Sequence, residues 1–544
     1  MPGSARFTSR PPLPRTLLLV PGLALALGAS PVAAQFLVSG PLREPLAPAG
    51  RLRVSFDPLF ASWHTRYREA EGSSAVVKEP LARDLTDPTG ARPFPGVALV
   101  QEHLAALTGS SLPTPVIGDV RGELTQNVRR VELRADVGVF SWLTVGAMVP
   151  WSRNRTALDV AFFPAPDATW GVNPAITDNE AVSTYLQAVG DAASLAADRA
   201  AGACATDPAS AACSAAERLA QRAGDFAARS QVMYFLAPFF PLAGTTPADA
   251  LTAAAVALED DLVAAGIGAI GAPAFATRTA DAEEFTTLTT DPAAGIQGSP
   301  LKSRKGLWEM GDAEFTAAAR ILRGSVVDSG AAHPRLAWDL QGGVLVRLGT
   351  GVPPSPDVFF DLGSGDGQTD VEGFVYGAFR AGSRMGLRAV ARYGIQRGAA
   401  LLRRVTAPDA PLAPLNSRRA VYWTPGKYLD LSLSPRIVLG DALALAVDYR
   451  RFRKNADRFS LLNPAGDGSD PDVSVLARET GLHATQIAIG LRYSTLDAWR
   501  AGKVGSPMDL SLRLVRTVAG SGGRTPADMR VEAGVSLFRR IWGS

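Results

Sequence analysis

From about residue 306 onward, the chain is organised in segments of about ten residues in which apolar and charged side chains alternate. In MDLSLRLVRT (508–517), the apolar side chains would project from one face of a strand, and Asp509, Ser511 and Arg513 from the other. The same pattern recurs in ALALAVDYRR, TQIAIGLRYS and RVEAGVSLFR, with stretches rich in Gly, Pro, Asp and Ser between them. Repeated segments of this kind are typical of a transmembrane β-barrel.

Alternation and turn residues together predict an all-β chain, an antiparallel transmembrane barrel of about twelve strands, within a range of about ten to fourteen. Short links such as GSR and LGD alternate with long ones, as the periplasmic turns and external loops of an outer-membrane barrel do. The strands are expected near 51–67, 127–139, 143–153, 308–322, 335–348, 370–381, 385–396, 427–437, 442–453, 483–494, 508–517 and 529–539.

One Ala-rich segment, residues 179–270, has apolar residues at helical spacing instead. It lies between the third and fourth expected strands, so we expect an α-helical insertion carried in a long external loop. Cys204 and Cys213 fall inside it, and in an exported chain they are expected to form a local disulfide.

The amino terminus has the pattern of a secretory signal peptide over residues 1–34. Three arginines precede an apolar stretch from Leu17 to Leu27, and small residues follow as far as Ala34. The stretch is too short to span a bilayer as a helix. The remaining residues, 35–544, would then form a barrel in the bacterial outer membrane.

Composition narrows the function less than periodicity does. The chain is 47% hydrophobic with a net charge of +3, and its charges are scattered. A nucleic-acid partner would need a concentrated basic face, so none is expected. The expected partners are outer-membrane lipid, small-molecule solutes and, during biogenesis, the barrel-assembly machinery.

Alternation also assigns a set of charged side chains to the inside of the barrel. Each would cost about 2–4 kcal/mol on the lipid face near the bilayer midplane, so it must face water or an opposite charge. If the charges pair across a narrow lumen, the barrel is closed; if they line a wider one, they form a polar path, and we favour a narrow or gated channel. The expected lumen-lining residues are Arg130, Glu132, Arg134, Asp136, Asp312, Glu314, Arg320, Asp339, Arg347, Asp370, Glu372, Arg388, Arg392, Asp448, Arg450, Arg492 and Arg513.

Four segments carry a resemblance to a known family. They are VELRADVGVFSWLTVGAMVPW (131–151), MGDAEFTAAARIL (310–322), LVRLGTGVP (345–353) and DLGSGDGQTDVEGFVYGAFRAG (361–382). The chain resembles outer-membrane proteins of the phenol-degradation meta-pathway transporter family. The resemblance implies an outer-membrane barrel that takes up small hydrophobic or aromatic compounds.

Rival chemistries have weaker support. His483 and Thr485 would share an outward face near the outer leaflet, but a hydrolytic site also needs a Ser nucleophile and an orienting group. The loops GSGDGQTD and NPAGDGSDPD offer carboxylates, yet neither follows the twelve-residue calcium loop. We therefore expect that the protein is not an enzyme and that it binds no metal ion and no cofactor. The predicted function is a channel or transporter for passive or gated passage of small solutes; the alternative is a non-conducting barrel that acts through its external loops.

Overall fold

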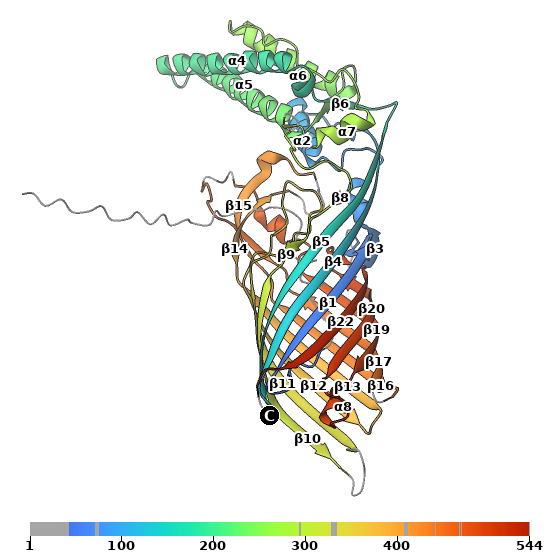
Figure 1. Ribbon diagram of the computed structural model, residues 1–544. Coiled ribbons are helices and arrows are strands. Elements are labelled where there is room, and N and C mark those ends of the chain that lie inside the picture. Colours follow the sequence, from blue (N-terminus) through green and yellow to red (C-terminus); the bar gives the residue numbers. More distant parts are fainter. Residues whose placement is uncertain are drawn as a thin grey trace, which may run out of the picture.

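The main body of the protein is a closed antiparallel β-barrel (Figure 1). The computed structural model describes residues 43–70, 75–292, 295–327, 334–406, 412–440, 442–466, 468 and 470–542. The main sheet has 14 strands, of which β8 (Arg304–Lys305) and β9 (Glu309–Met310) only extend the edge of β5. The other 12 form a ring, closed by pairing of β10 with β5, which confirms the predicted fold class and strand number.

The ring strands occur in chain order around the barrel, and the last one pairs with the first. Their bounds are β1 (Arg51–Trp63), β4 (Gly118–Phe140), β5 (Leu143–Pro164), β10 (Ala313–Val326), β11 (Leu336–Leu348), β12 (Asp370–Ala381), β13 (Met385–Gln396), β16 (Tyr428–Val438), β17 (Leu443–Lys454), β19 (Leu482–Ser494), β20 (Met508–Ser521) and β22 (Met529–Arg540).

Side chains alternate between the two faces of this wall as the period of two predicts. On β1, Val54 and Phe56 are 47% and 46% exposed, whereas Arg53, Ser55 and Asp57 are buried inside. An apolar outer wall around a charged interior is the arrangement that a lipid bilayer requires of a barrel. The chain is therefore a transmembrane β-barrel. Within the described residues, no helix is both long and apolar enough to cross a membrane.

The two ends of the barrel differ in their connections. β4 and β5 are joined by the turn 141–142, and β12 and β13 by 382–384, whereas the opposite end carries connections as long as 165–312. The predicted alternation of short and long connections fails near the end of the ring. The link 495–507, at the short-turn end, contains helix α8 (Leu496–Arg500), while 522–528 at the loop end is short.

The strands β4 and β5 are much longer than predicted and rise beyond the ring (Figure 1). The sequence indicated 127–139 and 143–153, because apolar alternation fades above these bounds. The extension carries a helical cap at the loop end. Its helices are α2 (Pro95–Thr108), α3 (Pro174–Thr177), α4 (Asn179–Thr206), α5 (Ala211–Leu236), α6 (Thr246–Ala264) and α7 (Ala282–Leu288), with β6 (Trp170–Val172) paired to β7 (Phe239–Pro241).

The cap has its own hydrophobic core. Val182, Tyr185 and Val189 recur at helical spacing on α4 and are buried against α5 and the tips of β4 and β5. Cys204 and Cys213 form a disulfide between the end of α4 and the start of α5. The helical cap extends beyond the predicted insertion of 179–270, since α2 and α7 lie outside that range and share the same core through Val97 and Phe285.

Small sheets that the sequence did not indicate lie at the loop end of the barrel. They comprise β14 (Ala399–Arg404), β15 (Arg418–Thr424) and β18 (Arg458–Leu461), and, in a second sheet, β2 (Thr65–Glu69), β3 (Val76–Pro80) and β21 (Thr525–Pro526). Short 3-10 helices accompany them at Leu81–Leu85, Leu415–Ser417 and Val473–Ala477. The predicted signal peptide, 1–34, lies outside the described residues.

Candidate functional site

The candidate site is the lumen, and all the charged residues assigned to it lie on the inward side of the wall or at its mouth. The more exposed members are only half-buried: Arg134, Arg320, Asp339, Arg392, Arg492 and Arg513. The others are less than a tenth exposed: Arg130, Glu132, Asp136, Asp312, Glu314, Arg347, Asp370, Glu372, Arg388, Asp448 and Arg450.

Around β10, β11 and β12, these charges join in one ion-pair network. Arg347 donates to Glu314 Oε1 (2.7 Å from Nη2) and to Asp370 Oδ2 (2.9 Å from Nη1). Arg134 reaches the other oxygen of Glu314 at 3.4 Å. Glu372 accepts a hydrogen bond from the Tyr428 hydroxyl (2.7 Å). Neighbouring strands thus neutralise one another's buried charges.

A second network lies on the strands β16 to β22. Arg513 bridges Asp448 and Glu532, both at 2.8 Å, and Arg450 pairs with Asp430 at 2.8 Å. Arg530 is buried and contacts Glu532 (3.0 Å). Alternation places Asp430 and Glu532 on the inward face as well, and both are buried there. Arg530 completes this network and was not among the residues expected in the lumen, although the same alternation marks it as inward.

Residues 43–50, which precede β1, enter the lumen from the short-turn end. Arg43 donates to both carboxylate oxygens of Asp57 (2.6 and 2.5 Å). Arg53 donates to the carbonyl oxygen of Glu44 (2.7 Å). This stretch has no regular secondary structure and no periodic pattern, so its place in the lumen could not be predicted from local sequence.

The next residues of this segment bond to the wall on two further strands. The Leu46 amide donates to Gln341 Oε1 on β11 (3.3 Å), and the Ala47 amide donates to Thr144 Oγ1 on β5 (2.9 Å). Leu46 and Ala47 are 6% and 3% exposed. The segment therefore lies across the lumen rather than along its rim.

A glycine in the wall makes room for this crossing. A Cβ on Gly138 of β4 would lie 2.1 Å from the carbonyl oxygen of Pro48, a distance that no side chain tolerates. Gly50 adopts a φ of +69° and donates its amide to the Gly138 carbonyl (2.8 Å), so the chain turns sharply into β1.

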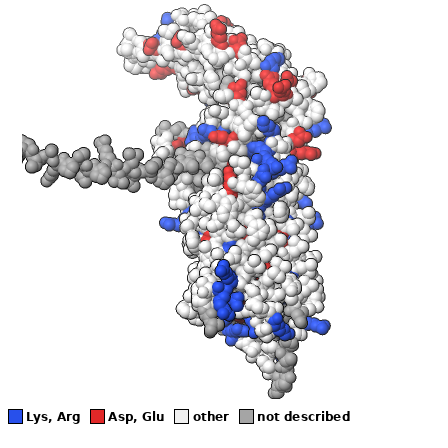
Figure 2. Space-filling view, in the orientation of Figure 1, with Lys and Arg blue, Asp and Glu red and all other residues white. Residues whose placement is uncertain are grey.

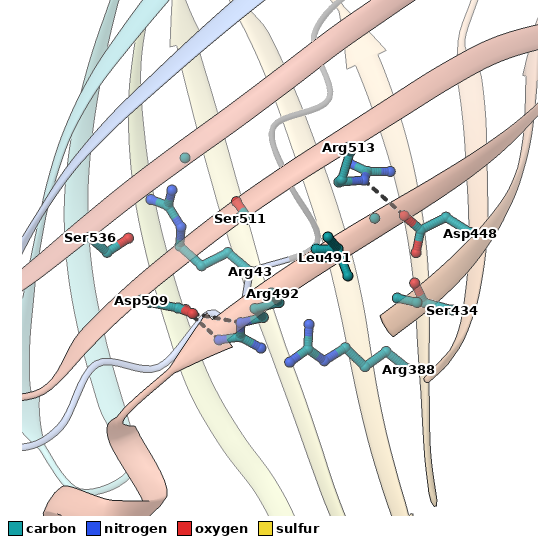
Figure 3. Close-up of a pocket in the computed structure, with 13 residues that line it drawn as sticks. Arg43, Arg388, Ser434, Asp448, Leu491, Arg492, Asp509, Ser511, Arg513 and Ser536 are labelled. Carbon is teal, nitrogen blue, oxygen red and sulfur yellow. Dashed lines mark hydrogen bonds and ion pairs between the residues drawn. The ribbon is translucent and has the colours of Figure 1, made fainter. Parts of the chain in front are cut away.

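Arg43 stands between two cavities of the lumen, of about 50 Å³ and 120 Å³. Figure 3 shows the smaller one, with the Arg43 guanidinium directed toward Ser511 and Ser536, and Arg492 and Arg388 on the other side of the lining. Each of these spaces has room for several waters. The ion pairs and the segment 43–50 together divide the lumen into small compartments.

At the loop end of the lumen, Asp312 lies before β10 rather than within a strand, which corrects the predicted strand 308–322. Its carboxylate accepts hydrogen bonds from the amides of Gly351 (2.8 Å) and Asp366 (3.0 Å) in the loop 349–369. Burial, together with the adjacent Asp366 carboxylate, raises the pKa of Asp312 to about 6.

The rival sites have the following geometry. His483 Nδ1 lies 3.2 Å from the Ser521 hydroxyl on the neighbouring strand, a serine that the sequence analysis did not find. Within the described residues, the other ring nitrogen of His483 makes no hydrogen bond. The one metal-like cluster among them is Cys204, Cys213 and Glu217, and its two sulfurs form the disulfide.

No family model and no curated protein matches the chain, so the family resemblance stays a prediction. Among solved structures, an outer-membrane channel from Pseudomonas putida F1 is similar, at 9% identity and a TM-score of 0.39, covering 92% of this chain and 100% of that one. The transport unit of the autotransporter AIDA-I from Escherichia coli is also similar (5% identity, TM-score 0.27, 93% and 94% covered). So is a toluene transporter from Pseudomonas putida (9%, 0.24, 95% and 94%). The fold assignment rests on the strand pairing described above.

Proposed function

We propose that the protein is a gated outer-membrane channel for small solutes, and that the segment Arg43–Gly50 is its gate. The observation that carries the proposal is the position of Arg43, which separates two cavities of one lumen. Displacing the segment would join them into a longer polar passage along the barrel.

The contacts that hold the segment are suited to reversible release. The Leu46 and Ala47 amides each make one hydrogen bond to a side chain of the wall. Such a bond contributes about 0.5–1.5 kcal/mol net, because water replaces it on opening. The Arg43–Asp57 pair is stronger, yet both groups would gain solvation in an open lumen.

The charges of both signs in the lumen favour small polar solutes, aromatic acids among them. An uncharged hydrocarbon would displace water from ion pairs without replacing its hydrogen bonds. The family resemblance instead favours hydrophobic or aromatic compounds. Uptake of benzoate and of toluene into vesicles that contain the protein distinguishes these two classes of solute. Preference for benzoate supports the polar path.

A disulfide lock tests the gate. In the variant Ala47→Cys with Thr144→Cys, oxidation should tie the segment to β5 and abolish single-channel steps in planar bilayers, and reduction should restore them. Wild type under the same reductant controls for the native Cys204–Cys213 disulfide, and Ala47→Cys alone controls for the substitution. Unchanged steps in the oxidised double variant would refute the gate.

The second candidate function is a non-conducting barrel that binds a partner through its cap. The favouring observation is that the cap core is continuous with loops of the barrel mouth through Phe359 and Leu412, so the cap is a rigid covering. Silence of wild type, of the reduced double variant and of a chain lacking residues 35–50 would support this candidate.

A further inference from the structure

Four basic residues form a patch on the outer wall of the barrel. They are Arg129 on β4, Arg153 and Arg155 on β5, and Lys305 on β8; Arg153 is half-buried and the others are exposed. Figure 2 shows Lys and Arg gathered over these strands below the cap, with a mostly uncharged band of wall beneath them and further basic residues toward the lower end. We call these four residues the basic patch.

The members of the patch face one another in like-charged pairs. Arg129 lies directly opposite Arg153, and Arg155 directly opposite Lys305, in the strand register. Directly opposed like charges destabilise a sheet. Among the residues that the structure describes, no carboxylate forms an ion pair with any of the four, and Arg153 donates only to the Gly306 carbonyl (2.9 Å). The wall thus concentrates positive charge that the described chain leaves unneutralised.

A groove of about 370 Å³ joins this patch to apolar wall. Besides Arg129, Arg153, Arg155 and Lys305, its lining includes Phe60, Met529 and Val531. Those three apolar side chains are 51%, 57% and 40% exposed on β1 and β22. Cations at one end and bare hydrocarbon at the other form an amphipathic site on the outside of the barrel.

The position of the groove relative to the bilayer indicates which kind of ligand it would meet. It lies where the apolar wall ends on the side of the long loops, which is the level of the outer-leaflet headgroups. We propose that the basic patch binds the phosphates of a phosphorylated glycolipid of the outer leaflet, with acyl chains against Phe60, Met529 and Val531. Arginine suits this ligand because its planar fork donates two parallel hydrogen bonds to phosphate oxygens. The site does not depend on conduction through the lumen.

The test uses the full chain in detergent micelles and measures its Kd for diphosphoryl lipid A by surface plasmon resonance. The double variant Arg153→Gln with Arg155→Gln should raise the Kd by about tenfold or more. The matched control, Arg384→Gln with Arg539→Gln, removes the same charge from exposed positions at the opposite rim and should leave the Kd unchanged. Heat-dependent mobility on gels establishes that both variants are folded.

Wild type supplies a second arm that needs no variant. Its affinity should fall as salt is raised, and dephosphorylated lipid A should bind more weakly than the diphosphoryl form. Equal affinity for the two lipids, or an unchanged Kd in the Arg153 and Arg155 variant, would overturn the proposal. Complete displacement of lipid A by inorganic pyrophosphate would also overturn it, because the patch would then recognise free phosphate.

Discussion

Arg347 is the residue on which the first lumen network depends, since it neutralises Glu314 and Asp370 together. These carboxylates are 2% and 0% exposed. In Arg347→Met, the buried Asp370 would lose its arginine and Glu314 would keep only the 3.4 Å contact with Arg134, so we expect unfolding to become easier by about 3–5 kcal/mol. The urea midpoint of the refolded protein in lipid vesicles, followed by tryptophan fluorescence, measures this change.

The matched control is Arg199→Met on α4, an exposed arginine whose replacement should leave the midpoint unchanged. A loss below about 1 kcal/mol in Arg347→Met would contradict the reasoning, because it would mean that lumen water already solvates both carboxylates.

For single residues, the sequence predicted which face of the wall a side chain occupies better than it predicted the ion-pair or hydrogen-bond partner of that side chain. Period two places Glu314, Arg347 and Asp370 inside because the side of a strand residue follows from its parity alone. It cannot tell that Arg347 bonds both carboxylates, since that depends on how three strands are staggered in the ring. The same limit hid Ser521 beside His483, which lies thirty-eight positions away in the chain.

Among the elements, the loop 349–369 should respond to pH through Asp312. The pKa of this carboxyl is raised to about 6, above its value of 3.8 in an unfolded chain. Between these values, the folded state binds the proton more tightly, so the loop loses stability as pH rises and gains it as pH falls. From about pH 7 to about pH 5, we expect a gain on the order of 1 kcal/mol, measured as hydrogen-exchange protection factors of residues 349–369.

Asp366→Asn supplies the matched comparison, because it removes the carboxylate that raises the pKa of Asp312 and keeps an oxygen to accept from the Gln368 amide. The protection gained on acidification should shrink in this variant. Equal protection at both pH values in wild type would show that Asp312 stays ionised.

Strands were predicted where one of their faces is apolar and meets lipid. Segments without such an apolar face were missed. Arg121, Glu123 and Arg155 are exposed on the outer face in the parts of β4 and β5 beyond the predicted bounds, so the contrast between faces disappears there although pairing continues. The segment 43–50 follows the same principle. Its position is set by bonds to Gln341 and Thr144, far along the chain, rather than by any local pattern.

For the whole molecule, the ring should fold without its cap. The gap left by the excursion 165–302 is about 20 Å at most, because Leu158 shares two hydrogen bonds of 3.2 Å with Ser303 and lies six strand residues before Pro164. The pairing of β5 with β10 uses residues 143–148 and needs nothing from the cap. A chain in which a short glycine linker replaces 165–302, which removes every helix of the cap except α2, should retain the heat-dependent gel mobility of a folded barrel.

Deletion of 313–348 makes the opposite comparison, since it removes β10 and β11 and leaves β5 without its partner. That chain should migrate as unfolded at every temperature. If the cap-less chain did so too, the cap would be required for ring closure, contrary to the strand pairing.

The pairing of β1 with β22 affects how the protein folds during synthesis and export. These two strands lie nearly a full chain length apart, yet each is the other's neighbour in the ring. Until translation and export have delivered β22, β1 exposes a row of unsatisfied amides and carbonyls on one edge, beside hydrocarbon side chains. Contacts between such distant segments form slowly. A nascent chain of this design needs a chaperone that prevents its exposed strand edges from pairing with those of other copies. Pairing of β22 with β1 closes the ring and ends that need.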